Sequence, residues 1–225
     1  MKAEIGTNTP AGMFANVVLD WSGTLCDDLP PVLETINRIL AHYEADPVDE
    51  ALFRAEFELP FDRFYQDRIP QASADELEAC YRKYFPLSDQ RATGLPHLHA
   101  FLEGRKEEGC RMFILSAATP SHFERQAEEL GVRSYFESCH TGVRDKRDVL
   151  GQLLVEKRLA REETCFIGDM RHDMETAHGA GVTAIAVLTG YDSAAKLEGA
   201  RPDLMVRDLE RMDALFRRFR KEMKA

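Results

Sequence analysis

The chain has 225 residues, of which 44% are hydrophobic and 30% charged, and its formal net charge is −10. The length fits one core domain with a small accessory domain, and the hydrophobic fraction is sufficient to bury a core. The acidic balance argues against nucleic acid or an anionic membrane as a partner, because both favour basic surfaces. We therefore expect the partner to be a small metabolite.

The sequence also lacks the features of an exported or membrane protein. No apolar stretch reaches the roughly 18 to 20 residues of a membrane-spanning helix, and residues 1–18 contain no compact apolar signal core. The cysteines show no CxxC pair and no metal-like spacing; they are Cys26, Cys80, Cys110, Cys139 and Cys165. We expect a cytoplasmic monomer or homodimer with free thiols.

Short apolar segments alternate with amphipathic stretches along most of the chain, as in a parallel sheet covered by helices on both faces. In chain order, the predicted strands are 17–19, 112–115, 164–167, 183–188 and 204–206. The helices predicted between and after them are 96–108, 121–130, 148–159, 176–181 and 209–224. The pattern predicts an α/β fold with a parallel sheet.

The stretch 28–91 breaks this alternation. It contains helical patterns at 32–43 and 75–85 but no convincing strand. Turns at Pro47, Pro60, Pro70 and Pro86 divide it into short helices. We therefore expect two domains: an α/β core made of residues 1–27 and 92–225, and a small α-helical cap made of residues 28–91.

The first chemical element is Asp20, which directly follows the strand 17–19. Open α/β sheets bind ligands at the carboxyl ends of their strands. There, Asp20 can attack phosphorus and form an aspartyl-phosphate. Gly23 would allow backbone amides to approach the phosphate, and Thr24 would donate a hydroxyl hydrogen bond to it. The structural alternative is an ordinary turn, in which Asp and Gly are common.

Two further elements offer phosphate ligands. The strand 112–115 runs into Ser116 and Ala117, and a capping sequence from Thr119 opens the next helix. Free amides at that helix start would face an anion near Ser116. Lys146 can hold the nucleophile and the phosphoryl oxygens together through its ammonium charge. Taken separately, these residues are better explained as a helix cap and a surface lysine.

The fourth element follows the strand 164–167, which is succeeded by Asp169 and Asp173. With Asp20 they form a set of hard oxygen ligands suited to Mg²⁺, which prefers carboxylate, water and phosphate oxygens. The structural alternative is a pair of acids that stabilises the N-terminus of a helix.

In this order the elements resemble the motifs of the haloacid dehalogenase superfamily. That family shows DxxGT, a strand-end Ser or Thr, a Lys, and GDxxxD; this chain has DWSGT, ILS, Lys146 and GDMRHD. The cap lies between the first two motifs, as in the subclass with a helical C1 cap, which includes phosphoglycolate phosphatase-like enzymes. The resemblance implies a magnesium-dependent hydrolase, expected to be a phosphatase of a small, phosphoglycolate-like metabolite acting through an aspartyl-phosphate.

The resemblance also implies roles for single residues. The expected catalytic positions are Asp20, Ser22 and Lys146. Mg²⁺ would be held by Asp20, the carbonyl of Ser22 and Asp169, with Asp173 in support. The expected phosphate ligands are Gly23, Thr24, Ser116, Ala117 and Lys146. The resemblance implies a Rossmann-like parallel sheet with the strand order 5-4-1-2-3, which places the first and fourth motifs on adjacent strands.

Ser22 departs from the family pattern, because most of its phosphatases carry an Asp at this position. A hydroxyl cannot replace a carboxylate as a general acid and base, a role worth about 10² to 10⁴ in rate. Two alternatives therefore stay open. One is a phosphonatase-like hydrolase, similar to phosphonoacetaldehyde hydrolase with its DWAGT, which needs a cap lysine that only Lys83 can supply. The other is a catalytically weakened homologue that binds phosphate in a regulatory role.

Cap residues select the substrate in enzymes of this kind. The cap segment 57–68 mixes aromatic residues with arginines. Arg63 or Arg68 could bind a substrate carboxylate through two parallel hydrogen bonds. An exposed guanidinium with no ligand is the alternative.

Overall fold

The computed structural model describes residues 14–223, so residues 1–13 of the expected core lie outside the description. A six-stranded sheet has the order β5-β4-β1-β6-β7-β8, and all its strand pairs are parallel. If the six strands are renumbered 1 to 6 in chain order and the sheet is read from the β8 edge, the order is 6-5-4-1-2-3. The first five strands of the chain therefore have the expected order 5-4-1-2-3. The strands are β1 (Asn16–Leu19), β4 (Arg111–Leu115), β5 (Ser138–His140), β6 (Thr164–Gly168), β7 (Thr183–Val187) and β8 (Leu204–Val206).

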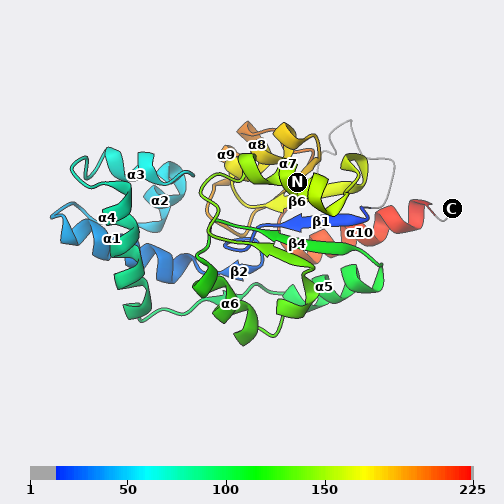
Figure 1. Cartoon of the computed structure of the whole chain (residues 1–225), viewed down its shortest axis with the longest axis horizontal. Helices are drawn as coiled ribbons and strands as arrows, with labels where there is room; N and C mark the ends of the chain where they lie inside the picture. Colours follow the sequence, from blue (N-terminus) through cyan, green and yellow to red (C-terminus); the bar gives the residue numbers. More distant parts are fainter. Residues whose placement is uncertain (1–13, 224–225) are drawn as a thin grey trace.

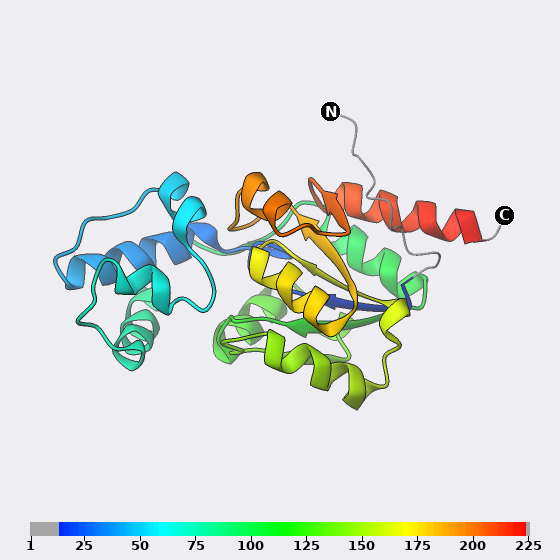
Figure 2. The ribbon, with the colours of Figure 1, turned by 90° about the horizontal axis from the view of Figure 1, so that it is seen from above.

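Helices cover both faces of this sheet (Figure 1, Figure 2). Three of them pack on the face that contains Val17 and Leu19, namely α5 (Leu98–Glu107), α6 (Pro120–Glu129) and α10 (Leu209–Met223). The face that contains Val18 is covered by α7 (Arg147–Lys157), α8 (Arg171–Ala180) and α9 (Ala194–Gly199). Successive strand residues point to opposite faces, so a strand buried on both faces is apolar throughout. The expected α/β class is confirmed.

The structure departs from the predicted elements at several places. Helix α8 begins at Arg171, five residues before the expected helix 176–181, because Asp173 already lies in its first turn. Strand β5 was not predicted, since it is a half-buried edge strand of three residues, Ser-Cys-His, with no apolar run. The short helix α9 and the 3₁₀ helices η2 (Arg133–Tyr135) and η3 (Arg161–Glu163) were not predicted either.

A second group of helices lies beyond the carboxyl ends of the strands, and the arrowheads of β1 and β4 point toward it (Figure 1). We call this group the cap. It contains α1 (Leu29–His42), α2 (Glu50–Glu56), α3 (Asp62–Gln66), α4 (Ala74–Tyr84) and the 3₁₀ helix η1 (Phe85–Leu87). Its apolar cluster includes Ile36, Phe53 and Leu77, together with Met170 and Tyr191 from the sheet side. The division into two domains at 28 and 91 stays a prediction.

Two short strands connect the cap to the sheet. β2 (Cys26–Asp27) pairs antiparallel with β3 (Thr93–Gly94), with Asp27 opposite Thr93. The chain therefore enters and leaves the cap at the same place. Within residues 14–223, no helix combines the length and the apolar character that crossing a membrane requires.

Candidate active site

Three carboxylates meet at the carboxyl ends of the two central strands. Asp20 follows β1, and its amide donates to the carbonyl of Ile167 in β6 at 2.9 Å. Asp169 follows β6, and Asp173 lies in the first turn of α8. Each offers one oxygen, and these oxygens lie within 4.8 Å of one another. All three residues are buried. A set of carboxylate oxygens this close fits a small, hard divalent cation.

Lys146 supplies the positive charge of this cluster. Its Nζ lies 2.9 Å from Asp20 Oδ1 and 2.7 Å from Asp173 Oδ1, and its side chain is fully buried. Burial lowers the pKa of Lys146, but the charges of Asp173 and Asp20 outweigh it and leave the pKa raised. Burial raises the pKa of Asp20, which Lys146 only partly offsets. One ammonium group therefore contacts two of the three buried carboxyl groups.

Asp169 is held rigidly by its neighbours. The hydroxyl of Thr24 donates to its Oδ1 at 2.9 Å, and the amide of Tyr191 donates to its Oδ2 at 2.7 Å. A Cβ at Gly23 or Gly190 would collide with this carboxylate, and Gly23 also has φ of +70°. Burial raises the pKa of Asp169 well above its ordinary value, and the charges of Asp20 and Asp173 add to the rise.

The structure places several of the predicted site residues around one cavity of about 590 Å³, namely Asp20, Ser22, Ser116, Ala117 and Lys146. Gly23 and Thr24 do not line it. The amide of Gly23 donates to the carbonyl of Cys26 at 2.7 Å, and the hydroxyl of Thr24 is bonded to Asp169. In this structure the two residues shape the Asp169 site instead of facing the substrate space.

Arg63 lies away from this cavity. Its side chain is 80% exposed, and its guanidinium is 3.3 Å from the carboxylate of Glu58. It lines a separate surface hollow with Arg147 and Arg171. The structure therefore does not bring Arg63 to the carboxylate cluster.

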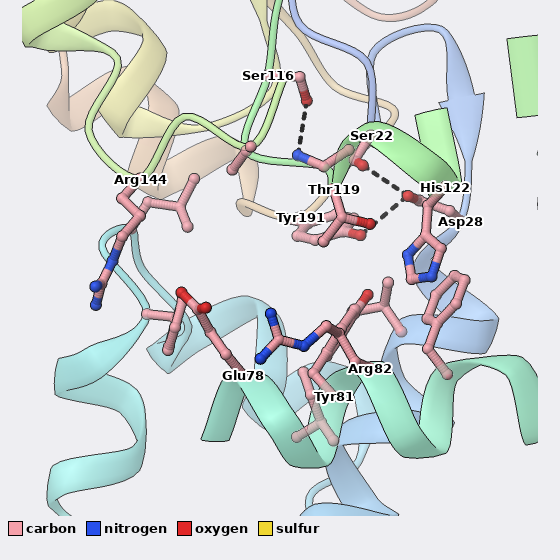
Figure 3. A pocket seen from close by; sticks show the side chains of 18 of the residues that line it. Ser22, Asp28, Glu78, Tyr81, Arg82, Ser116, Thr119, His122, Arg144 and Tyr191 are labelled. Atoms are coloured by element: carbon pink, nitrogen blue, oxygen red, sulfur yellow. Dashed lines mark hydrogen bonds between the residues drawn. The ribbon is translucent and has the colours of Figure 1, made fainter. Parts of the chain in front are cut away.

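Asp28 is the site residue that sequence analysis missed (Figure 3). Its Oδ2 accepts a hydrogen bond from the hydroxyl of Ser22 at 2.6 Å, and its Oδ1 accepts one from the hydroxyl of Tyr191 at 2.9 Å. Burial raises the pKa of Asp28 to about 7, although these two hydrogen bonds oppose the rise. A carboxyl group thus contacts the side chain that replaces the family's acid and base.

The sequence around Asp28 gave a different signal. Asp before Leu-Pro-Pro is typical of a helix N-cap, because Asp favours the cap and Pro favours the first turn. Asp28 does occupy the N-cap position of α1, but its side chain makes no capping hydrogen bond. The side chain of Asp28 points back to Ser22 and Tyr191 instead. The local sequence does not indicate this orientation, because Tyr191 comes from a loop 163 positions away.

Lys83 is exposed on α4, with its Nζ 4.9 Å from the centre of the Tyr84 ring. It does not line the cavity at Asp20, where the described cap residues contribute one cation, Arg82. The lysine required by the phosphonatase-like alternative is therefore not at the site.

Comparison with known proteins agrees with this geometry. A sequence model of haloacid dehalogenase-like hydrolases matches residues 17–187. A phosphoglycolate phosphatase of Synechococcus elongatus is 27% identical, covering 84% of this chain and 91% of its own. The pyrophosphatase PpaX of Bacillus mycoides is 23% identical over similar shares, 84% and 91%. A crystal structure described as a predicted phosphatase from Clostridium acetobutylicum superposes with a TM-score of 0.80 at 16% identity, covering 90% of this chain and 98% of its own.

The match spans the whole site, from β1 before Asp20 to β7 beyond Asp173. The fold, the order of the motifs and the cluster of three carboxylates agree with it. The chain belongs to the haloacid dehalogenase-like hydrolase family.

Proposed function

We propose that this protein is a magnesium-dependent phosphatase that hydrolyses a small phosphorylated metabolite through an aspartyl-phosphate on Asp20. The observation that carries this proposal is the buried cluster of Asp20, Asp169, Asp173 and Lys146. Asp20 and Lys146 of this cluster line the cavity. The phosphoglycolate phosphatase of Synechococcus elongatus supports a phosphomonoester as the substrate and makes 2-phosphoglycolate the first compound to test.

The donor set fits Mg²⁺. Three buried carboxyl groups share one buried ammonium, which leaves excess negative charge that a divalent cation would neutralise. Asp20, Asp169, Asp173 and the carbonyl of Ser22 would hold the ion. When bound, it would offset the charge of the phosphate oxygens.

The residues of the chain then have separate roles in the reaction. A carboxylate oxygen of Asp20 attacks phosphorus while the bond from phosphorus to the alcohol oxygen breaks, and the departing alcohol oxygen takes a proton from solvent. Lys146 holds Asp20 and the transferred phosphoryl oxygens, and Ser116 donates a hydroxyl hydrogen bond to them. Water then attacks phosphorus, which releases inorganic phosphate and regenerates the Asp20 carboxylate.

The proposal is tested by measuring phosphate release from 2-phosphoglycolate and simple alkyl phosphates, with Mg²⁺ and with a chelator. Rapid acid quenching during turnover should leave a phosphoryl group on the peptide that contains Asp20, detectable by mass spectrometry. If no ester is hydrolysed while phosphate and Mg²⁺ bind tightly, the protein is instead a phosphate-binding homologue.

Mg²⁺ should stabilise the wild-type protein and leave Asp169→Asn without this stabilisation, because the variant loses a charged ligand. At about 100 times the dissociation constant, a bound ion contributes roughly 2.7 kcal/mol. For a chain of this size that raises Tm by about 5 to 10 °C. Differential scanning fluorimetry with and without Mg²⁺ measures the shift.

Without Mg²⁺, Asp169→Asn should be at least as stable as wild type, because it removes one of three clustered acids. The matched control is Asp203→Asn, an acid that accepts from the amide of Ala184 outside the cluster. Its magnesium shift should equal that of wild type. A full shift in Asp169→Asn would place the metal elsewhere.

Ser22→Asp alone should raise turnover less than the double variant Ser22→Asp/Asp28→Ser. In the single variant two carboxyl groups would meet where Ser22 now donates to Asp28 at 2.6 Å. Like charges this close raise the pKa of the pair and destabilise the fold as pH rises. The double variant relieves this contact and should gain up to about 10² to 10⁴ in rate.

Hydrolysis of an alkyl phosphate at pH 8, with Tm measured in parallel, compares the two variants. Alkyl esters are the sensitive substrates, because their poor leaving groups need a proton donor. Equal activity and equal stability of the single and double variants would show that Asp28 does not constrain position 22.

A further inference from the structure

The cavity at Asp20 extends from the catalytic end of the sheet into the cap, and its cap wall is apolar. Asp20, Ser22 and Lys146 lie at the sheet end. The cap wall is formed by Val32, Ile36, Phe57, Leu59, Phe61 and Tyr65, and by Leu77, Tyr81 and Phe85. The cavity has a volume of about 590 Å³, which lies within the range of roughly 300 to 1,000 Å³ found for pockets that enclose drug-sized ligands.

The aromatic rings of this wall pack against one another. The ring of Phe85 stacks on that of Tyr81 with centroids 5.3 Å apart, and on that of His122 at 4.2 Å. Burial and the nearby charge of Arg125 lower the pKa of His122, which makes this imidazole neutral near pH 7. Phe61 meets Tyr65 edge-on at 6.2 Å. Such walls favour flat, apolar groups in offset or edge-to-face contact.

The basic groups that line the cavity do not form a site for a substrate carboxylate. Glu78 and Arg82 lie one turn apart on α4, and both side chains point into the cavity (Figure 3). A substrate carboxylate would meet Glu78 as well as Arg82. The Arg144 guanidinium packs 5.6 Å from the centre of the Phe61 ring. Lys146 is already bonded to Asp20 and Asp173.

We propose that the substrate is a phosphate monoester whose alcohol part carries an aromatic ring or an apolar body of similar size, which the cap wall encloses. The proposal rests on the proposed phosphatase function and specifies the organic part of its substrate. A two-carbon acid such as glycolate would leave the apolar wall uncovered, whereas an aromatic ring would cover the wall and lose its own apolar surface to the contact, so that both are removed from water.

The test compares esters that share an alkyl leaving group and differ in their organic part. We would measure kcat/KM with Mg²⁺ for ethyl phosphate, 2-phosphoglycolate, 2-phenylethyl phosphate and 3-phenylpropyl phosphate. The two phenyl esters should exceed the other two by about 10- to 100-fold, mainly through KM, because an apolar group is buried on binding. Equal values, or a preference for 2-phosphoglycolate, would overturn the proposal and leave the phosphatase function standing.

Binding provides a second readout that does not depend on turnover. Ethylphosphonate, phosphonoacetate and 2-phenylethylphosphonate can be titrated calorimetrically into the wild-type protein with Mg²⁺. The phenyl compound should bind about 10-fold tighter or better. If it does so while no ester is hydrolysed, the assignment of the cavity holds and the proposed turnover fails. If the three phosphonates bind equally, the assignment of the cavity is wrong.

Variants at Phe61 test whether the preference for phenyl esters arises from the cap wall. Phe61 is half-buried and lines the cavity, so Phe61→Ala should fold and should reduce the phenyl preference by about 3- to 10-fold. Phe61→Lys should reduce it further and improve 2-phosphoglycolate. The matched control is Tyr84→Ala, a half-buried aromatic residue of the cap outside the cavity lining. An equal loss in the control would overturn the proposal.

Discussion

Asp20→Asn should reduce phosphate release from every substrate by about 10⁴-fold or more, the scale on which loss of a covalent nucleophile acts in other hydrolases. The amide keeps the shape of the side chain but cannot attack phosphorus as a carboxylate does. Burial raises the pKa of Asp20 in the wild-type protein, so the neutral amide should not destabilise the metal-free fold. Initial rates with saturating Mg²⁺ and equal Tm values without Mg²⁺ test both statements.

The matched control for this variant is Asp27→Asn, a partly buried acid on β2 outside the carboxylate cluster. It should retain most of the wild-type rate. Residual turnover above about 1% in Asp20→Asn, with the expected Tm, would exclude Asp20 as the nucleophile. Another oxygen of the site would then have to form the bond to phosphorus.

Lys146→Met should destabilise the metal-free protein by about 3 to 5 kcal/mol, because it leaves buried carboxylates without their positive partner. The side chains of Lys146 and Asp173 are fully buried, and that of Asp20 is 5% exposed. For this chain length the loss lowers Tm by roughly 6 to 20 °C. Urea unfolding monitored by circular dichroism gives the free energy directly.

The pH dependence of this loss has a defined sign. Burial already raises the pKa of Asp20 in the folded wild-type protein, and without the charge of Lys146 this pKa rises further. Stability is then retained at low pH, where Asp20 is protonated in both the folded and the unfolded state, and lost as pH rises through the folded-state pKa. The variant should therefore be closer to wild type at pH 5 than at pH 8.

A second substitution distinguishes whether the stability loss in Lys146→Met comes from the missing charge or from altered packing. Lys146→Met/Asp173→Asn should regain much of the lost stability, because the remaining cluster carries one charge fewer. Lys157→Met, which removes a lysine that pairs with exposed Glu156, should change stability by less than about 1 kcal/mol. If the double variant is as unstable as the sum of its single changes, the contact between Lys146 and Asp173 contributes nothing.

The sheet was predictable because its central strands carry their signal locally. After a polar first residue in each, β1, β4 and β6 are apolar on both faces, since helices cover both, and this produces a continuous hydrophobic run. Asp20 and Asp169 were predictable as a pair because strand ends of a parallel sheet meet at one edge. β5 carried no such signal, because an edge strand with Ser138 and His140 buries little.

Contacts between distant segments could not be predicted in this way. Thr24 lies in a turn beside Asp20 in the sequence, yet its hydroxyl bonds to Asp169, a partner 145 positions away. The bond between Tyr191 and Asp28 spans 163 positions and joins a loop after β7 to the start of the cap. Arg63 is the opposite case. An arginine is chemically suited to bind a substrate carboxylate, but in the structure its side chain lies exposed on the surface.

The antiparallel pair of β2 and β3 gives the molecule a modular architecture. Because Asp27 lies opposite Thr93, a short turn between them would close the chain without shifting β1 or the loop that carries Asp20. Insertions of different length and composition can therefore be exchanged at this junction during evolution or by protein engineering. On the proposed function, changes within the cap beyond Asp28 would alter the selectivity for the organic group while the carboxylates at the strand ends stay in place.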